Sequence, residues 1–355
     1  MASIMTNAAA LTALQSLNAT NKSLEQTQAR ISTGYRVSQA SDNAAYWSIA
    51  TTMRSDNQAL STVQDALGLG ASKVDTAYTG MNNVLTTIGN LKTKLLSTIG
   101  QTDAAKAKTQ TEITALQAQM KSFADAATFS GSNYLSVTSK QVAAPNDGVQ
   151  PDSQIVSSFN RSSSGAISLG TINIDVESTK LFDSGLSTDV KNQGIIDRKT
   201  SVYATAAAQN LYDTAYAAAI AGGGTDIAAN TAGQTAAGAV AKVDNVSAFN
   251  VDITASGVTD DIITQMVNKI DKVMSQLTDS ATILGSAKSS IDLQKTFTQS
   301  LMDSIDRGVG QLVDADMNKE STRLQALQVQ QQLGIQSLSI ANSSSQSILS
   351  LFKNG

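Results

Sequence analysis

The feature that most constrains this chain is a long run of apolar residues spaced alternately three and four positions apart. The run begins at Ile49 and ends at Leu95, and only Asp56 and Gly70 interrupt it. Its mean period of about 3.5 residues is that of the seam between helices in a coiled coil. The sequence therefore predicts a long helix over 49–95 that packs against another helix. The stripe consists of Ile49, Met53, Leu60, Val63, Leu67, Val74, Ala77, Met81, Val84, Ile88, Leu91 and Leu95.

This helix needs partners, because each of the four glycines between positions 68 and 89 costs about 1 kcal/mol relative to alanine. Two other segments have the same spacing. One runs from Ile113 to Ala127 after a turn near Gly100, and the other runs from Ile263 to Leu312. Packing such helices side by side buries their stripes and offsets the glycine cost. We expect a mainly α fold, in which helices from both chain ends form a long antiparallel coiled-coil bundle.

The two ends of the chain carry weaker stripes. The N-terminal stripe is Leu14, Leu17, Leu24 and Ile31, with Asn21 and Gln28 inside it. The C-terminal stripe is Met317, Leu324, Leu327, Leu338, Ala341, Ile348 and Phe352, and a second row (Leu333, Ile340, Ser347) lies beside it. One interpretation is a frayed helix pair that completes the bundle. However, a helix with two apolar faces favours more than one neighbour, which points to contacts with other chains.

The composition favours thin helix seams over a thick enzyme core. Aromatic residues make up 4% of the chain and charged residues 15%, and the abundant alanine buries little area. The chain has no cysteine and no histidine, which excludes thiolate sites and removes the commonest general base and metal ligand. The net charge of −4 argues against nucleic acid and anionic membrane as partners. No segment approaches the roughly 18 apolar residues of a membrane span.

The spacing pattern stops between residues 141 and 258 and then returns, as it would around an inserted domain. Segments 167–176 and 249–254 alternate apolar with polar residues and predict strands. Segment 201–224 is rich in alanine and ends in glycines, which predicts a helix with a glycine stop. We therefore expect an inserted outer domain of α+β character.

No stretch carries a recognisable catalytic or metal-binding motif. The "AGGG" at 221–224 lacks the strand, lysine and helix of a phosphate loop, so we expect a flexible turn. Asp260 and Asp261 stand where the third long helix should begin, and acidic residues stabilise a helix N-terminus. Asp314 and Asp316 fall in a turn between two helical runs. We expect no catalytic residue, no metal site and no cofactor, so the chain is predicted not to be an enzyme.

Segment 31–53, "ISTGYRVSQASDNAAYWSIATTM", holds the only tryptophan, Trp47. Gly34 can end one helix, and Ser41 or Asp42 can cap the next one. One reading is a well-capped helix start with a single large anchor. The other is that this polar segment, which we call the spoke (residues 34–47), contacts a neighbouring subunit.

Three separated motifs resemble bacterial flagellin. They are "ISTGYRVSQASDNAAYWSIATTMRSD" (31–56), "EITALQAQMKSFADAATFSG" (112–131) and "LVDADMNKESTRLQALQVQQQLGIQSLSIANSSSQSILSLF" (312–352), in the order that the family has them. The resemblance covers roughly residues 1–140 and 260–355. Tyr46 and Trp47 replace the family's usual small aliphatic pair, in the manner of alphaproteobacterial flagellins.

The resemblance implies three regions. Residues 1–40 with 314–355 would form an inner coiled coil at the filament core. Residues 41–140 with 259–313 would form a helical rod, and residues 141–258 would form a variable outer domain. Thousands of such subunits would stack into a hollow helical filament used for swimming.

The resemblance also implies partners and a location. The first charged residue is Lys22, so the N-terminus lacks a secretory signal and by itself indicates a cytoplasmic protein. Flagellins are instead exported by the flagellar type III apparatus, which places this chain in the extracellular filament. Expected partners are copies of itself, other flagellins, hook-associated and cap proteins, and an export chaperone.

By this resemblance certain residues are expected to contact other copies. The spoke candidates are Tyr35, Arg36, Asp42, Tyr46 and Trp47. The candidates on the terminal helices are Leu14, Leu17, Leu24, Ile31, Leu324, Leu327, Leu333, Leu338, Ile340, Ile348, Leu349 and Phe352. These terminal helices are expected to become ordered on assembly.

One inherited property is an immune-receptor face. Glu112 aligns with a glutamate that an animal innate immune receptor reads in many flagellins, but no arginine occurs between Arg54 and Arg161. We therefore expect receptor recognition to be lost.

The alternatives are a hook–filament junction protein, which shares the terminal helices, and a type III-secreted coiled-coil protein. An enzyme in residues 140–258 would need clustered carboxylates, which that segment lacks.

Overall fold

The computed structural model describes residues 7–139, 150–162, 164–184, 193–223 and 226–353, apart from the side chains of 226–227 and 344–353. The chain folds as two compact units. The first contains residues 1–61 and 300–355, and the second contains residues 62–299. The three-region division expected from the resemblance remains a prediction.

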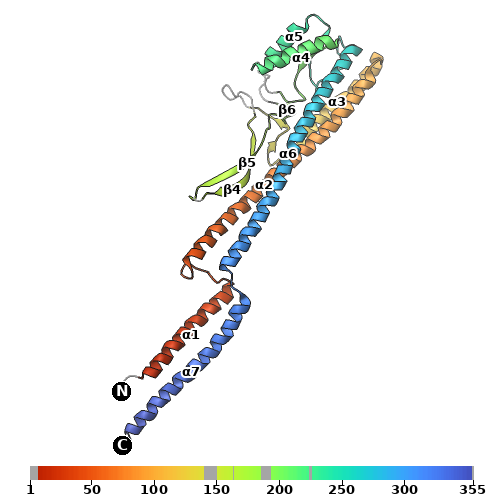
Figure 1. Ribbon diagram of the computed structural model, residues 1–355. Coiled ribbons are helices and arrows are strands. Elements are labelled where there is room, and N and C mark those ends of the chain that lie inside the picture. The colour runs from red at the N-terminus through yellow and green to blue at the C-terminus, as the bar shows by residue number, and fades with distance from the viewer. Residues whose placement is uncertain (1–6, 140–149, 163, 185–192, 224–225, 354–355) are drawn as a thin grey trace. The chain divides into compact units, whose positions relative to one another are not determined.

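Long helices dominate the described part of the chain, as the apolar spacing predicts (Figure 1). The helices are α1 (Ala8–Thr33), α2 (Ala44–Thr98), α3 (Asp103–Ala126), α4 (Ala206–Ala221), α5 (Asp226–Ala237), α6 (Asp260–Val313) and α7 (Met317–Lys353). Among these residues, no helix combines the length and apolar character that a bilayer span requires.

The strands are short and pair two by two. They are β1 (Thr128–Phe129) with β2 (Ser132–Asn133), β3 (Ser136–Val137) with β6 (Phe182–Asp183), β4 (Ser153–Arg161) with β5 (Ile167–Ile174), and β7 (Thr200–Tyr203) with β8 (Lys242–Val246). Of these four described pairs, β3 with β6 is parallel and the other three are antiparallel.

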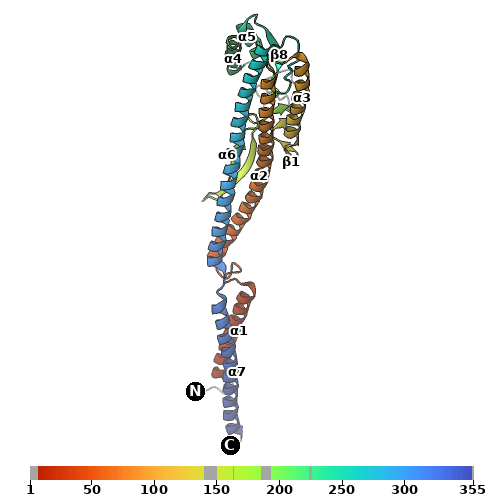
Figure 2. The same cartoon turned by 90° about the vertical axis from the view of Figure 1, so that its right-hand side faces the viewer.

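In the second unit α2 and α6 pack as an antiparallel pair, with α3 beside them (Figure 2). Gln64 bonds to Gln299 at 3.2 Å, Asp75 pairs with Lys288, and Lys92 pairs with Asp271 at 2.5 Å. The predicted stripe is buried throughout this unit, from Val63 to Leu95. The predicted α2–α6 coiled coil is therefore confirmed.

Gly70 interrupts the stripe because strand β4 approaches α2 at this point. A Cβ at position 70 would lie 2.6 Å from Cγ2 of Ile155, which is closer than two carbon atoms can pack. Ile155 is buried against α2 and belongs to the same core. The lack of a side chain at Gly70 therefore makes room for Ile155 of the β4–β5 hairpin.

The middle region is α+β as predicted, although two element predictions there are wrong. Segment 167–176 forms β5, but 249–254 is an irregular loop and the strand lies earlier, at β8. The side chains of Gln110 and Gln117 hold this loop. They donate to the Val251 carbonyl at 3.1 and 3.0 Å, and the Ile253 amide donates to Gln110 at 3.0 Å.

The prediction of a helix over 201–224 is also wrong at its start. The first residues of this segment form β7, and α4 begins only at Ala206. Gly222 caps α4 and Gly223 has a φ of 82°, as a turn requires. Helix α5 then opens at Asp226, whereas we expected no helix behind the glycines. Gly224 lies outside the described residues.

In the first unit α1 and α7 lie side by side and antiparallel (Figure 1). Ile49, the first residue of the predicted stripe, is also in this unit and is 49% exposed. Ala50 takes its place in a small core with Val37, Val309 and Val313. The stripe therefore begins one residue later than we predicted.

Candidate functional site

The α1–α7 seam contains most of the predicted stripe residues but is thin and partly polar. Leu17, Leu24 and Ile31 on α1 are half-buried, and on α7 Leu327 is buried while Leu324 and Leu338 are half-buried. Leu14 on α1 and Met317 on α7 are both 46% exposed, so neither lies in the seam within one chain, whereas the contact of Leu14 with other copies stays a prediction.

Two threonines lie deeper in the seam than the neighbouring amides that the sequence pattern places there. Thr20 and Thr27 are buried, whereas Asn21 is half-buried and Gln28 is exposed. Thr20 donates its hydroxyl to the Ser16 carbonyl at 2.9 Å, so it enters the seam without an unpaired polar group. A buried threonine leaves less apolar contact area than leucine would.

Polar contacts fix the register of this seam. Gln331 donates to Asn21 at 2.7 Å, and Arg30 pairs with Glu320 at 3.3 Å. At the far end of α1 the Asn7 side chain donates to the Ala341 carbonyl at 2.9 Å. Such pairs specify alignment more than they add stability.

The second apolar row of α7 faces away from α1. Leu333 is 59% exposed and Ile340 is 68% exposed. Val329 and Ile335 on the same helix are also more than half exposed. The side chains of Ser347, Ile348, Leu349 and Phe352 lie outside the described residues. In a single chain, α7 therefore has an apolar face that no described residue covers.

Backbone hydrogen bonds tie the spoke to the junction between α6 and α7. Gly34 ends α1 in the left-handed region with a φ of 76°, as predicted. The Arg36 amide donates to the Val313 carbonyl at 2.6 Å, and the Ala315 amide donates to the Gly34 carbonyl at 2.8 Å. These bonds fix where the spoke leaves α1.

The cap of α2 is Asn43 rather than the predicted Ser41 or Asp42. Its Oδ1 accepts from the amides of Ala45 and Tyr46, both at 3.1 Å. Asp42 instead closes the spoke, because it accepts from the amides of Ser38 and Gln39 at 3.0 and 3.1 Å. These backbone bonds lower the pKa of Asp42 below its ordinary value.

Arginine side chains stack on two of the three aromatic rings of the spoke. The Arg54 guanidinium lies 4.8 Å from the centre of the Tyr35 ring, and that of Arg36 lies 6.0 Å from the Tyr46 ring. Tyr35, Tyr46 and Trp47 remain 37%, 41% and 39% exposed. Large rigid aromatic rings that are fixed in position and partly exposed to solvent are typical of protein–protein contact surfaces.

Two models of the same family match the two ends of the chain. The bacterial flagellin N-terminal helical region matches residues 4–140, and the bacterial flagellin C-terminal helical region matches residues 267–352. Flagellin C of Rhizobium meliloti (strain 1021) is 46% identical over 358 residues, which cover 99% of this chain and all of the relative. A flagellin of Brucella melitensis biotype 1 is 44% identical over 353 residues, with the same coverage.

The chain belongs to the flagellin family.

Family membership confirms the predicted resemblance and assigns a structural role. The chain is a subunit of the flagellar filament and polymerises with other copies of itself. The matches do not favour the hook–filament junction protein or the secreted coiled-coil protein. The functional surfaces of such a subunit are those that meet other copies.

The acidic residues weighed as a catalytic site have structural roles. Asp260 is the first residue of α6 and accepts from the Gly100 amide at 3.0 Å and from Lys106 at 2.7 Å. Asp316 accepts from the amides of Asn318 and Lys319, which open α7. The described residues contain no group of three or more acidic side chains that could hold a metal ion.

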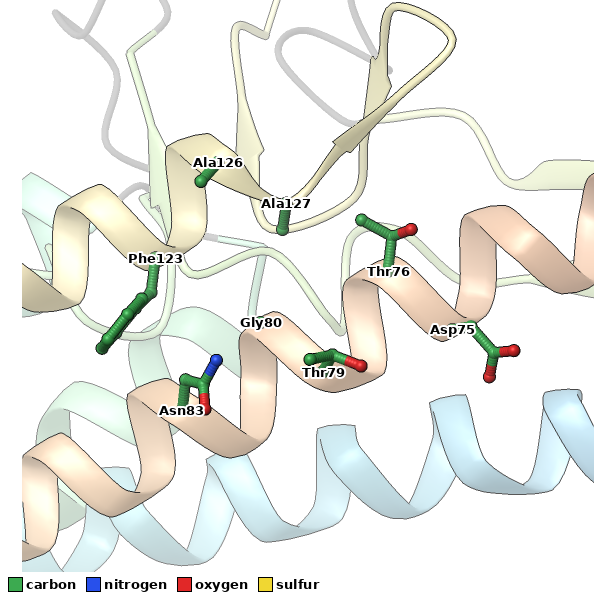
Figure 3. Close-up of a pocket in the computed structure, with 8 residues that line it drawn as sticks. All are labelled: Asp75, Thr76, Thr79, Gly80, Asn83, Phe123, Ala126 and Ala127. Carbon is green, nitrogen blue, oxygen red and sulfur yellow. The ribbon is translucent and has the colours of Figure 1, made fainter.

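A groove of about 360 Å³ lies between α2 and the end of α3. Figure 3 shows the residues that line it. Gly80 leaves its floor without a side chain, while Phe123 and Asp75 lie towards opposite ends. Asp75 is already paired with Lys288. The groove therefore offers no free charge to a ligand.

Sequence reasoning missed several residues of this site, among them Asn43, Val37 and Val313 in addition to Thr20 and Thr27. Asn43 could have been found, because asparagine is as good a cap as aspartate and stands directly before the helix. Val37 and Val313 form the small core beneath the spoke. Val37 belongs to no periodic stripe, so no sequence signal indicated it, whereas Val313 lies four residues after Val309 and could have been found from the helical spacing.

Proposed function

We propose that this subunit contacts its neighbours in the filament through the second apolar row of α7 and through the spoke. The observation that carries the proposal is the exposure of Leu333 and Ile340 on the side of α7 away from α1. Burying one large aliphatic side chain contributes about 1.5–3 kcal/mol. A row of such side chains covered by other copies would add to what the α1–α7 seam gains within one chain.

We also propose that ordering of the terminal helices is completed by assembly. The seam contains Thr20, Thr27 and Gly334 at positions where a stable coiled coil would have leucine or isoleucine. Helices with so little apolar contact are marginal in water, because packing supplies most of their stability. Neighbouring copies would supply the missing contacts.

The remaining roles rest on family membership. We infer an extracellular location in the filament and export through the flagellar type III apparatus with a chaperone. We also infer contacts with hook-associated and cap proteins, and co-assembly with other flagellins. The role is structural, with no catalytic step, no nucleic acid and no membrane partner.

We propose that Glu112 does not serve as an immune-receptor contact in this chain. Its carboxylate pairs with Lys94 at 2.5 Å, and no arginine occurs between Arg54 and Arg161. A receptor that reads a free glutamate beside an arginine would find neither.

The test replaces the exposed apolar row with charge, as Leu333→Asp with Ile340→Asp. We expect the monomer to keep its helical circular dichroism, because both side chains are already exposed, and to lose polymerisation measured by sedimentation and electron microscopy. The matched control, Gln325→Asp with Gln332→Asp, adds the same charge at exposed polar positions of α7 and should still polymerise.

Normal filaments from the Leu333–Ile340 variant would overturn the proposal. Loss of filaments from both variants would show that added charge, rather than loss of apolar contact, prevents assembly.

A further inference from the structure

The outer module, defined as α4, α5, β7 and β8, has a core of its own. Tyr203, Tyr212, Ala208 and Ala237 are buried together, and the rings of Tyr203 and Tyr212 lie 5.5 Å apart. Two lysines of α6, Lys269 and Lys272, connect this module to the helix. They are one turn apart but bind different kinds of group.

Lys269 binds both strands of the module at once. Its ammonium nitrogen donates to Oγ1 of Thr200 at 2.6 Å and to the carbonyl oxygen of Val246. Thr200 and Val246 are directly opposite each other in the β7–β8 register. A single amine therefore clamps the first pair of this two-stranded sheet against α6.

The two lysines differ in their electrostatic surroundings. Lys272 forms an ion pair with Asp213 of α4, whereas both oxygens that accept from Lys269 are uncharged. In the described part of the chain, no carboxylate lies within 4.0 Å of the Lys269 nitrogen. The charged groups that face it are Asp213 on α4, Arg198 before β7 and Lys272 on α6 itself.

This environment disfavours the charged form of Lys269. Enclosure of the amine lowers its pKa from the ordinary 10.5 to about 7, and Arg198 adds to the effect while Asp213 opposes it. A neutral amine still carries the two hydrogens that the two contacts need. The two hydrogen bonds can therefore form with a neutral Lys269 amine, whereas the charged form is disfavoured in this environment.

We propose that Lys269 is a proton-coupled clamp, which holds the outer module to α6 more tightly as the solution becomes more alkaline. A released lysine in water keeps its proton up to pH 10.5, whereas the clamped lysine gives it up near pH 7. Clamping therefore releases a proton between these values. The attachment constant rises about tenfold per pH unit in that window and is constant below it.

The experiment measures hydrogen exchange of the β7 and β8 amides in the full-length monomer between pH 7 and 9, divided by the intrinsic exchange rate at each pH. We expect protection to rise about tenfold per pH unit in the natural chain. Lys269→Met is permanently neutral and should lose this slope. Lys269→Arg is permanently charged and should show low protection at every pH.

Lys272→Met is the matched control, because it removes the neighbouring lysine and its ion pair but leaves the clamp. It should keep the slope. A slope that is absent from the natural chain, or that persists in Lys269→Met, overturns the proposal.

A second measurement does not depend on the folding of these variants. The Lys269 amine can be titrated by nuclear magnetic resonance in chain labelled with ¹³C-lysine. A midpoint near pH 7 supports the clamp, and a midpoint near 10.5 refutes it.

Discussion

At the scale of single residues, the spoke shows how a chain poor in aromatics uses the few it has. Trp47 lies in the first turn of α2 and is 39% exposed. Arg54 and Arg36 hold the neighbouring Tyr35 and Tyr46 rings. A ring whose position is fixed before contact loses little entropy on binding. The spoke is thus suited to meeting another copy.

We predict that Trp47 becomes less exposed on polymerisation. Its fluorescence emission should shift to shorter wavelength in the filament, because the indole leaves water. The Leu333–Ile340 aspartate variant, which should remain monomeric, serves as the control under the same conditions. Identical spectra for monomer and filament would show that Trp47 takes no part in the contact.

At the scale of secondary-structure elements, two glycines of α2 differ in whether the surrounding structure requires them. Gly70 makes room for Ile155 of β4, whereas Gly89 has no atom within 4 Å of where a Cβ would lie. A glycine in a helix interior costs about 1 kcal/mol relative to alanine. That cost is offset at Gly70 by the hairpin and is not offset at Gly89.

We predict opposite effects from alanine at these two positions. Gly70→Ala should lower the free energy of unfolding by about 1–3 kcal/mol, because its methyl group overlaps Ile155. Gly89→Ala should raise it by about 0.5–1 kcal/mol, because it only restricts the unfolded chain. Urea denaturation of the full-length monomer measures both. A shift of both unfolding midpoints in the same direction would contradict the conclusion that Gly70 makes room for Ile155.

At the scale of the whole molecule, the two units differ in how well each completes its own core. The second unit buries a continuous stripe along α2 and α6, together with α3 and the hairpin. The first unit has a small valine and alanine core near the spoke and a thin seam between α1 and α7. This difference is why we propose that neighbouring copies in the polymer stabilise the first unit.

We predict that deleting residues 313–355 abolishes filaments while leaving the second unit helical. The deletion removes α7 and its apolar row but no residue of 62–299. Sedimentation would report the loss of polymer, and circular dichroism would report the helix that remains. Filaments of normal length and number from the shortened chain would defeat the proposed role of α7.

The sequence was sufficient for features that depend on neighbours along the chain. The heptad spacing predicted α2, α3, α6 and α7, and the motifs at both ends predicted the family. Gly34 predicted the end of α1, because the left-handed conformation there is a local property of glycine. The alternation at 167–176 predicted β5 for a similar reason.

Features that depend on which surfaces meet were decided only by the tertiary structure. Thr20 and Thr27 are buried in the seam and Gln28 is exposed, while Asn21 stays half-buried at the seam in its bond to Gln331, because the position of α7 sets the rotation of α1. The loop at 249–254 has a strand-like pattern but is held by two glutamines of α3. Periodicity records that a face is apolar, but the partner's position determines which residues of that face are buried, since burial is a property of the pair.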